Sequence, residues 1–137
     1  MNDQKAFIIR NFEKEDLAAV RHINYVTGLM GETLENTGIF NDKKLFNMLF
    51  IDYYVLFEPE NCFVAIDPLT DEVVGYILST LDTETQEKNF RNYYYWRIFL
   101  RMYFVDWWKY PESFRFMQKL INAFPESLSG CAVAAAA

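Results

Sequence analysis

The feature that most constrains the fold is a pair of apolar runs in the middle of the chain, residues 63–66 and 73–78. Both runs are rich in β-branched and aromatic residues, which favour strands. The segment between them contains Pro68, which favours a turn, and Asp67 and Asp71, whose carboxylates can accept hydrogen bonds from backbone amides. The pattern predicts an antiparallel hairpin. Because both runs are almost continuously apolar, it also predicts a central sheet with both faces covered.

The composition is that of a folded, soluble protein. The chain has 137 residues, of which 52% are apolar and 23% charged, so a single domain with a substantial core is expected. A net charge of −6 argues against nucleic acid or an anionic membrane as a partner. The first residues lack the apolar stretch of a signal peptide, so the expected compartment is the cytoplasm.

The motifs of several enzyme and metal-site classes are missing from the sequence. Cys62 and Cys131 are the only cysteines, and neither belongs to a Cys-x-x-Cys or Cys/His cluster. Walker loops, Rossmann glycines and serine nucleophile motifs do not occur either. No metal ligand is therefore predicted, and the catalytic residues stay unknown at this level.

Helical spacing of apolar residues predicts a first helix after a short strand at residues 7–10. Asn11 is its expected cap, and Gly28 is a plausible end. A second helix is predicted for residues 42–57, with Asn41 or Asp42 as its cap. Apolar side chains surround most of this second helix, which indicates burial on more than one side.

Residues 83–124, after the hairpin, are also predicted to be helical. Thr83 and Gln86 match a capping box at the start of this region. Pro111 stands where a later helix can begin, because proline suits the first helical turn.

The first part of this helical region, residues 89–108, is unusually rich in aromatic side chains. Its charged residues and short apolar length exclude a membrane span, and the acidic chain disfavours stacking on single-stranded nucleic acid. We predict a buried aromatic helix, with an inward stripe of Tyr93, Trp96, Phe99 or Leu100, Tyr103 and Trp107. The exposed remainder of the helical region is a candidate partner surface. The region could form a homodimer or serve as a lid over an active site.

The hairpin also carries a family resemblance. The sequence Phe-Val-Ala-Ile at residues 63–66, the acidic turn, and Val-Val-Gly-Tyr-Ile-Leu at residues 73–78 resemble the second and third strands of the GNAT acyltransferase superfamily. Residues 7–10 and 15–17 resemble the first strand and first helix of that fold. The resemblance implies an α/β fold with a mixed, mostly antiparallel central sheet flanked by helices. The helical region that follows is an insertion relative to the family, in which a short loop normally joins the third and fourth strands.

This resemblance implies an acyl-CoA-dependent N-acyltransferase. The co-substrate would be acetyl-CoA, and the acceptor would be a primary amine on a small molecule or peptide. Direct attack by the neutral amine would need no covalent enzyme intermediate, and the sheet would orient both reactants. Two alternatives stay open: a non-catalytic GNAT-like binding or dimerisation module, and an unrelated small α+β interaction protein.

In this family the segment between the first two helices often helps to form the acceptor site. The resemblance therefore implies that residues 28–40, which include Glu32, line a substrate cleft; a surface loop without this role is the alternative. Tyr53 and Tyr54 in the second helix and Tyr76 in the hairpin are further candidate substrate-binding residues. For the two helix tyrosines, a place in the core is the commoner outcome.

The family binds the pyrophosphate of acetyl-CoA with the pattern Gln/Arg-x-x-Gly-x-Gly/Ala at a helix N-terminus, and this pattern does not occur in the 137 residues. No cofactor-binding residue is therefore assigned. We expect residues 131–137 to occupy the position of the fourth strand. On this view, residues 1–137 form a single GNAT-like domain that is truncated before or within that strand.

Overall fold

The apolar runs of the hairpin form β2 (Cys62–Asp67) and β3 (Glu72–Leu78), which pair antiparallel as predicted. In the turn, the Asp67 carboxylate accepts a hydrogen bond from the Leu69 amide, and Asp71 takes a positive φ, which aspartate tolerates better than most residues. β1 (Ile8–Asn11) pairs antiparallel with the other edge of β2, so the sheet order is β1-β2-β3. This computed structural model describes residues 6–28 and 34–123.

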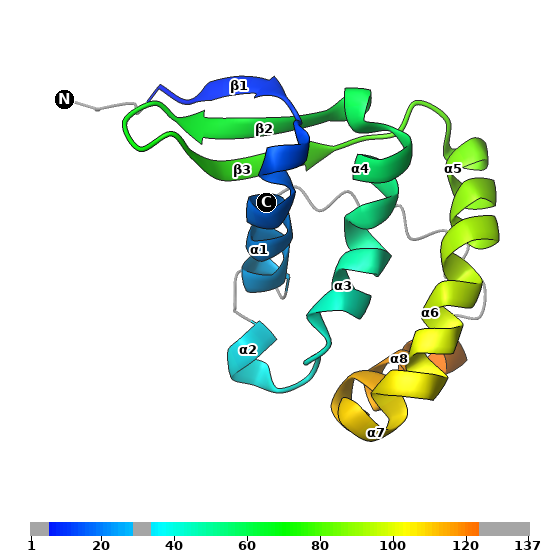
Figure 1. Ribbon diagram of the computed structural model, residues 1–137. Coiled ribbons are helices and arrows are strands. Elements are labelled where there is room, and N and C mark those ends of the chain that lie inside the picture. The colour runs from blue at the N-terminus through cyan, green and yellow to red at the C-terminus, as the bar shows by residue number, and fades with distance from the viewer. Residues whose placement is uncertain (1–5, 29–33, 124–137) are drawn as a thin grey trace.

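The helical elements lie on one side of this sheet (Figure 1). α1, the pair α3–α4 and the helix that begins with α5 run roughly side by side below it, with α3 in contact with both α1 and α6. In chain order the elements are η1 (Lys14–Asp16), α1 (Leu17–Thr27), α2 (Leu34–Thr37), α3 (Lys43–Phe50), α4 (Asp52–Phe57), η2 (Pro59–Asn61), α5 (Thr83–Phe90), η3 (Arg91–Tyr95), α6 (Trp96–Arg101), η4 (Met102–Asp106), α7 (Trp107–Lys109) and α8 (Pro111–Ala123).

The helix starts follow local capping chemistry, with two corrections. Asp42 caps α3 as predicted, since its carboxylate accepts hydrogen bonds from two amides of the first turn. The predicted cap Asn11 is wrong, because this residue ends β1 and the helix is entered through the η1 turn. Asp82, rather than Thr83, caps α5, because its carboxylate accepts hydrogen bonds from two backbone amides of the first turn. Pro111 begins α8 as predicted.

The prediction that both faces of the sheet are covered is wrong for the described residues. The face toward the helices carries Val64, Ile66 and Tyr76, all buried. On the other face Ile9 and Ile77 are exposed, and none of the described helices covers them. The alternation expected of a strand buried on one face is therefore present, although apolar residues occupy both faces.

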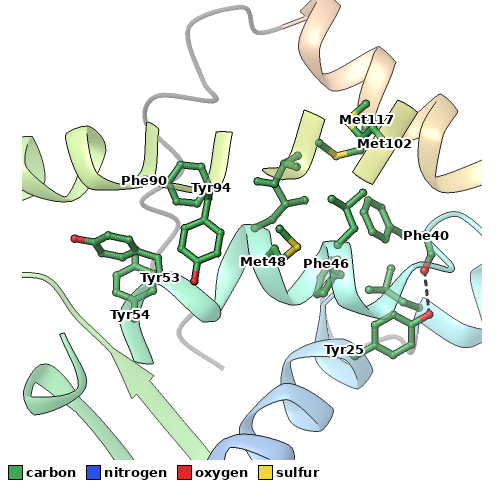
Figure 2. Close-up of a cluster of buried hydrophobic side chains, with 14 of the residues drawn as sticks. Tyr25, Phe40, Phe46, Met48, Tyr53, Tyr54, Phe90, Tyr94, Met102 and Met117 are labelled. Carbon is green, nitrogen blue, oxygen red and sulfur yellow. Dashed lines mark hydrogen bonds between the residues drawn. The ribbon is translucent and has the colours of Figure 1, made fainter. Parts of the chain in front are cut away.

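The larger hydrophobic cluster lies between the helices, away from the sheet. Figure 2 shows Phe90 and Tyr94 from the helix after β3 facing Tyr53 from α4. Most of the aromatic rings in this cluster meet edge to face. One example is the pair Phe40 and Phe46, with 5.4 Å between the ring centroids. A smaller cluster joins α1 and α4 to the sheet and contains Val20, Ile51, Val64, Ile66 and Tyr76.

The helix from residue 83 to 109, called here the long helix, buries every fourth residue. Its buried side chains are Gln86, Phe90, Tyr94, Ile98, Met102 and Asp106. η3 and η4 are π-helical turns, which hold more residues than an α turn. In a regular α-helix of 3.6 residues per turn, positions four apart rotate steadily around the helix axis. The wider π-helical turns offset this rotation, so positions four apart stay on one face.

The predicted inward stripe of the long helix is wrong. Trp96, Phe99, Leu100, Tyr103 and Trp107 are exposed, and Tyr93 is half-buried. The stripe assumes a regular α-helical period, and the π-helical turns change which residues share a face. The prediction that residues 83–124 are helical is confirmed up to Ala123, where the described residues end.

Two other sequence predictions concern Cys62 and the fourth strand. Cys62 is a free, buried thiol, and burial raises its pKa to about 11, so it acts as a small apolar side chain. The predicted fourth-strand position, residues 131–137, lies outside the described residues. None of the described helices is long and apolar enough to cross a membrane.

Candidate functional site

The tyrosines predicted to bind substrate belong to the core. The side chains of Tyr53, Tyr54 and Tyr76 are at most 6% exposed. The Tyr54 hydroxyl accepts a hydrogen bond from Gln86, and the Tyr76 hydroxyl donates one to Asn24. Packing and these internal bonds account for their presence, and their role in substrate binding stays a prediction. Glu32, the fourth candidate, lies outside the described residues.

A cleft of about 340 Å³ opens among α1, α3–α4 and the long helix, and is called here the three-helix cleft. Of the α3–α4 side chains in it, Lys44, Met48, Asp52 and Leu56 follow one another at four-residue spacing, which places them on one helical face, with Val55 beside them. The lining residues are Phe12, Lys14, Leu17 and Arg21 near α1, Lys44, Met48, Asp52, Val55 and Leu56 on α3–α4, and Tyr93, Tyr94 and Arg97 on the long helix.

The three-helix cleft is cationic, although the chain as a whole is acidic. Its one carboxylate, that of Asp52, accepts hydrogen bonds from Arg21 Nε at 3.0 Å and Arg21 Nη2 at 2.7 Å. Lys14, Lys44 and Arg97 form no ion pair with any carboxylate of the described residues. The cleft therefore has an excess of positive charge, which favours an anionic ligand.

Tyr94 adds a hydroxyl group to this cleft. Its side chain is only 4% exposed, its hydroxyl makes no hydrogen bond with any described residue, and the hydroxyl oxygen is open to the cleft rather than enclosed. Burial raises the pKa of Tyr94, the charge of Asp52 raises it further, and the charges of Arg21 and Arg97 lower it. The hydroxyl therefore keeps its proton at neutral pH. It interacts electrostatically with Arg21 on α1, Asp52 on α4 and Arg97 on the long helix.

A second hollow, of about 570 Å³, lies between the start of α1 and the β2–β3 turn. It has the opposite character, with Glu15, Asp16, His22, Asp71 and Glu72 in its lining. Asp16 is already engaged by the Arg10 guanidinium through two hydrogen bonds of 2.7 and 2.8 Å. Within the described part of the chain, no group of His, Cys, Asp or Glu side chains is arranged to hold a metal ion.

A buried carboxyl pair, Asp42 and Asp106, lies outside both hollows. Arg101 binds Asp42 through two hydrogen bonds, with Nε at 2.6 Å and Nη2 at 2.8 Å. Burial is the largest single effect on the pKa of Asp42 and acts to raise it, but the interactions with Arg101, Asp106 and the Leu45 amide together outweigh burial and leave the pKa below its usual value. For Asp106, burial and then the interaction with Asp42 raise the pKa to about 8. The pair joins the start of α3 to the long helix, which is a structural role.

No single sequence motif indicates the three-helix cleft, so it was not predicted. Its cations come from positions 14, 21, 44 and 97, and each looks like an ordinary surface charge in its own segment. The only local signal is the presence of Arg97 in the aromatic stretch. Bringing these side chains together required the packing of three helices.

Comparison with known proteins gives an informative similarity to a solved structure. No protein-family model matches the chain, and no curated protein sequence matches it. A solved structure titled "Crystal structure of SsHAT" is similar, with 28% identity and a TM-score of 0.59. The similarity covers 70% of this chain and 45% of SsHAT, so the chain spans less than half the length of that protein.

This similarity supports an acetyltransferase-like fold. Together with the antiparallel three-stranded sheet and the helices on it, it confirms the predicted fold class, a GNAT-like mixed α/β fold. Membership of the GNAT superfamily itself stays a prediction.

Proposed function

We propose that this protein is an acyl-CoA-dependent N-acyltransferase that transfers an acetyl group from acetyl-CoA to a primary amine. The observation that carries the proposal is the similarity to SsHAT over 70% of the chain. The acceptor would be a small molecule or a peptide. The cytoplasm, predicted from the sequence, is the proposed compartment.

The reaction needs two reactants held close together rather than a covalent enzyme intermediate. The neutral amine nitrogen attacks the thioester carbonyl, the C–N bond forms, the C–S bond breaks, and the amine proton leaves as the thiolate gains one. Most of the rate enhancement would come from orientation of the reactants. Among the described residues, the cations and the Tyr94 hydroxyl of the three-helix cleft suit phosphate groups, and acetyl-CoA carries phosphates.

The proposal is tested with the purified chain, acetyl-CoA and a panel of amines. The panel contains a simple alkylamine, an aminoalkyl phosphate, an amino acid and a lysine-containing peptide. We expect saturable binding of acetyl-CoA in a calorimeter, release of free CoA thiol, and an amine product heavier by one acetyl group. Absence of both binding and product across the panel would contradict the proposal.

The alternative is a non-catalytic GNAT-like binding or dimerisation module. The specific observation in its favour is the aromatic face of the long helix, which stays exposed on the described residues. The same experiment discriminates between the two functions, because a module would give no acetylated amine. It would instead associate through that face.

A further inference from the structure

We infer that the three-helix cleft binds an amphipathic organic anion. Its phosphate or carboxylate group would lie among Arg21, Lys44 and Arg97. Its apolar part would lie against Leu56 and Tyr93, which line the same cleft. The binding step stands independently of acyl transfer, but the identification of this ligand as a reactant rests on the proposed function.

Arg21 is oriented before any ligand arrives. Its Nε and Nη2 atoms both donate to Oδ1 of Asp52, which fixes the plane of the guanidinium group. Its remaining Nη1 group makes no hydrogen bond with a described residue. The pair is part-buried, and the orientation of Arg21 is already set. The Arg21 side chain would therefore lose little further freedom when a ligand oxygen binds at Nη1.

Lys44 and Arg97 supply charge that nothing described neutralises. Arg97 lies over the Tyr93 ring, with 4.3 Å between the guanidinium carbon and the ring centroid, so its position is restrained by an aromatic side chain rather than by an acid. The four cations of the cleft contrast with one carboxylate, which Arg21 already occupies. A polycationic ligand such as a lysine-rich peptide is disfavoured there for the same reason.

The Tyr94 hydroxyl adds a hydrogen-bond donor that opens to the cleft and has no partner among the described residues. A nearly buried tyrosine usually finds an internal hydrogen-bond partner, as Tyr25 does with the Phe40 carbonyl at 2.9 Å. Tyr94 has none among the described residues, and it lines the cleft. Its protonated hydroxyl is available to donate to an oxygen of the bound anion.

The apolar residues of the cleft favour a ligand that has an apolar part as well as an anionic group. Leu56 is 56% exposed, and Val55 and Tyr93 are half-buried beside it. Covering this surface with an alkyl or aromatic group of the ligand would remove apolar area from water. Inorganic phosphate alone would not use this surface, so it should bind more weakly than an organic phosphate.

The first experiment measures binding without acetyl-CoA. Hexyl phosphate, inorganic phosphate, hexanol and hexylamine are titrated into the purified chain at low salt, by calorimetry. We expect hexyl phosphate to bind at least about tenfold more tightly than each of the other three. Equal affinity for hexyl phosphate and hexanol would overturn the inference, because the cations would then contribute nothing.

Matched variants localise the site. The double variant Lys44→Gln with Arg97→Gln removes two cleft cations, and the control variant Lys88→Gln with Arg115→Gln removes two exposed cations outside the cleft lining. We expect at least about a tenfold loss of affinity in the first and less than about a twofold loss in the second. Equal losses would show only a general charge effect and would overturn the site assignment. Tyr94→Phe should weaken binding severalfold while the chain keeps its melting temperature.

A second set of experiments tests whether the bound anion is the co-substrate or the acceptor. The same experiments distinguish a failure of this inference from a failure of the proposed function. Displacement of hexyl phosphate by CoA but not by pantetheine would identify the phosphates of the co-substrate as the ligand. An aminoalkyl phosphate that becomes acetylated only when Arg97 is present would identify the acceptor. Anion binding without any acetyl transfer would support the cleft and contradict the proposed function, and transfer without anion binding would do the reverse.

Discussion

The carboxyl group of Asp106 is fully buried, and no described donor makes a hydrogen bond to either of its oxygens. The neighbouring Asp42 keeps the negative charge, because Arg101 binds it at both oxygens. Ser113 Oγ accepts hydrogen bonds from the Asn41 and Asp42 amides, so the start of α8 is joined to the same pair. A neutral Asp106 beside a charged Asp42 is the arrangement that costs least in this environment.

This pair predicts a pH dependence of stability. The Asp106 pKa is near 3.8 in a free side chain and about 8 in the fold, so between these values the unfolded chain has lost a proton that the folded chain keeps. The free energy of unfolding should therefore fall as the pH rises through this window. We expect Asp106→Asn to remove this fall and to be more stable than the wild type by at least about 1 kcal/mol at pH 9.

The measurement is urea unfolding of both proteins at several pH values between 4 and 9. Glu60→Gln removes an exposed carboxylate and serves as the control, with a pH profile that should follow the wild type. Parallel profiles for wild type and Asp106→Asn would show that Asp106 titrates normally and that its pKa is not raised.

At the scale of elements, the long helix shows how backbone geometry chooses a buried face. Its two π-helical turns keep residues 90, 94, 98, 102 and 106 in line against α3, α4 and α8. The larger aromatic residues between these positions face outward. The side chains that turn inward at positions 98 and 102, Ile98 and Met102, are less bulky than the tryptophans that stay outside, and Met102 adapts readily to an irregular gap.

Two neighbouring substitutions test this register. Ile98 is 4% exposed and Phe99 is 50% exposed. We expect Ile98→Ala to lower the free energy of unfolding by about 2–4 kcal/mol, because it leaves a cavity, and Phe99→Ala to lower it by less than about 1 kcal/mol. Denaturant unfolding at low protein concentration gives both values. A larger loss for Phe99→Ala would restore the stripe predicted from a regular α-helical period.

At the scale of the whole molecule, the described residues leave two apolar surfaces uncovered. One is the outer face of the sheet, with Ile9 and Ile77. The other is the aromatic face of the long helix, defined by Trp96, Phe99, Leu100, Tyr103, Phe104, Trp107 and Trp108, each between 42% and 72% exposed. Contiguous apolar surfaces of this kind commonly mark an interface.

The predicted homodimer uses the aromatic face. In a two-fold dimer each copy presents the same patch, and tryptophan and tyrosine contribute strongly to such interfaces. We expect the sedimentation coefficient of the wild type to rise with concentration, and Phe104→Lys with Trp107→Lys to stay monomeric. Ile77→Lys, on the sheet face, is the matched control and should associate as the wild type does. A wild type that is monomeric throughout would rule out this dimer.

Local signals in the sequence determined the elements. The hairpin follows from two apolar runs around a proline- and aspartate-containing turn. Asp42 caps α3 and Pro111 begins α8, because capping and proline effects act within a few residues. The burial of Cys62 followed from its place at the start of an apolar strand. Each of these features depends on atoms close together in the chain, so the residues themselves were sufficient to predict it.

The tertiary structure decided which surfaces these elements share. The open face of the sheet depends on how many layers pack on it, and the buried face of the long helix depends on where π-helical turns form against α3 and α8. The three-helix cleft joins Lys14, Arg21, Lys44 and Arg97 across three helices, and the Asp42–Asp106 pair joins positions 64 residues apart. Long-range packing creates these sites, because charge and burial act through space and no local pattern records which distant residues will meet.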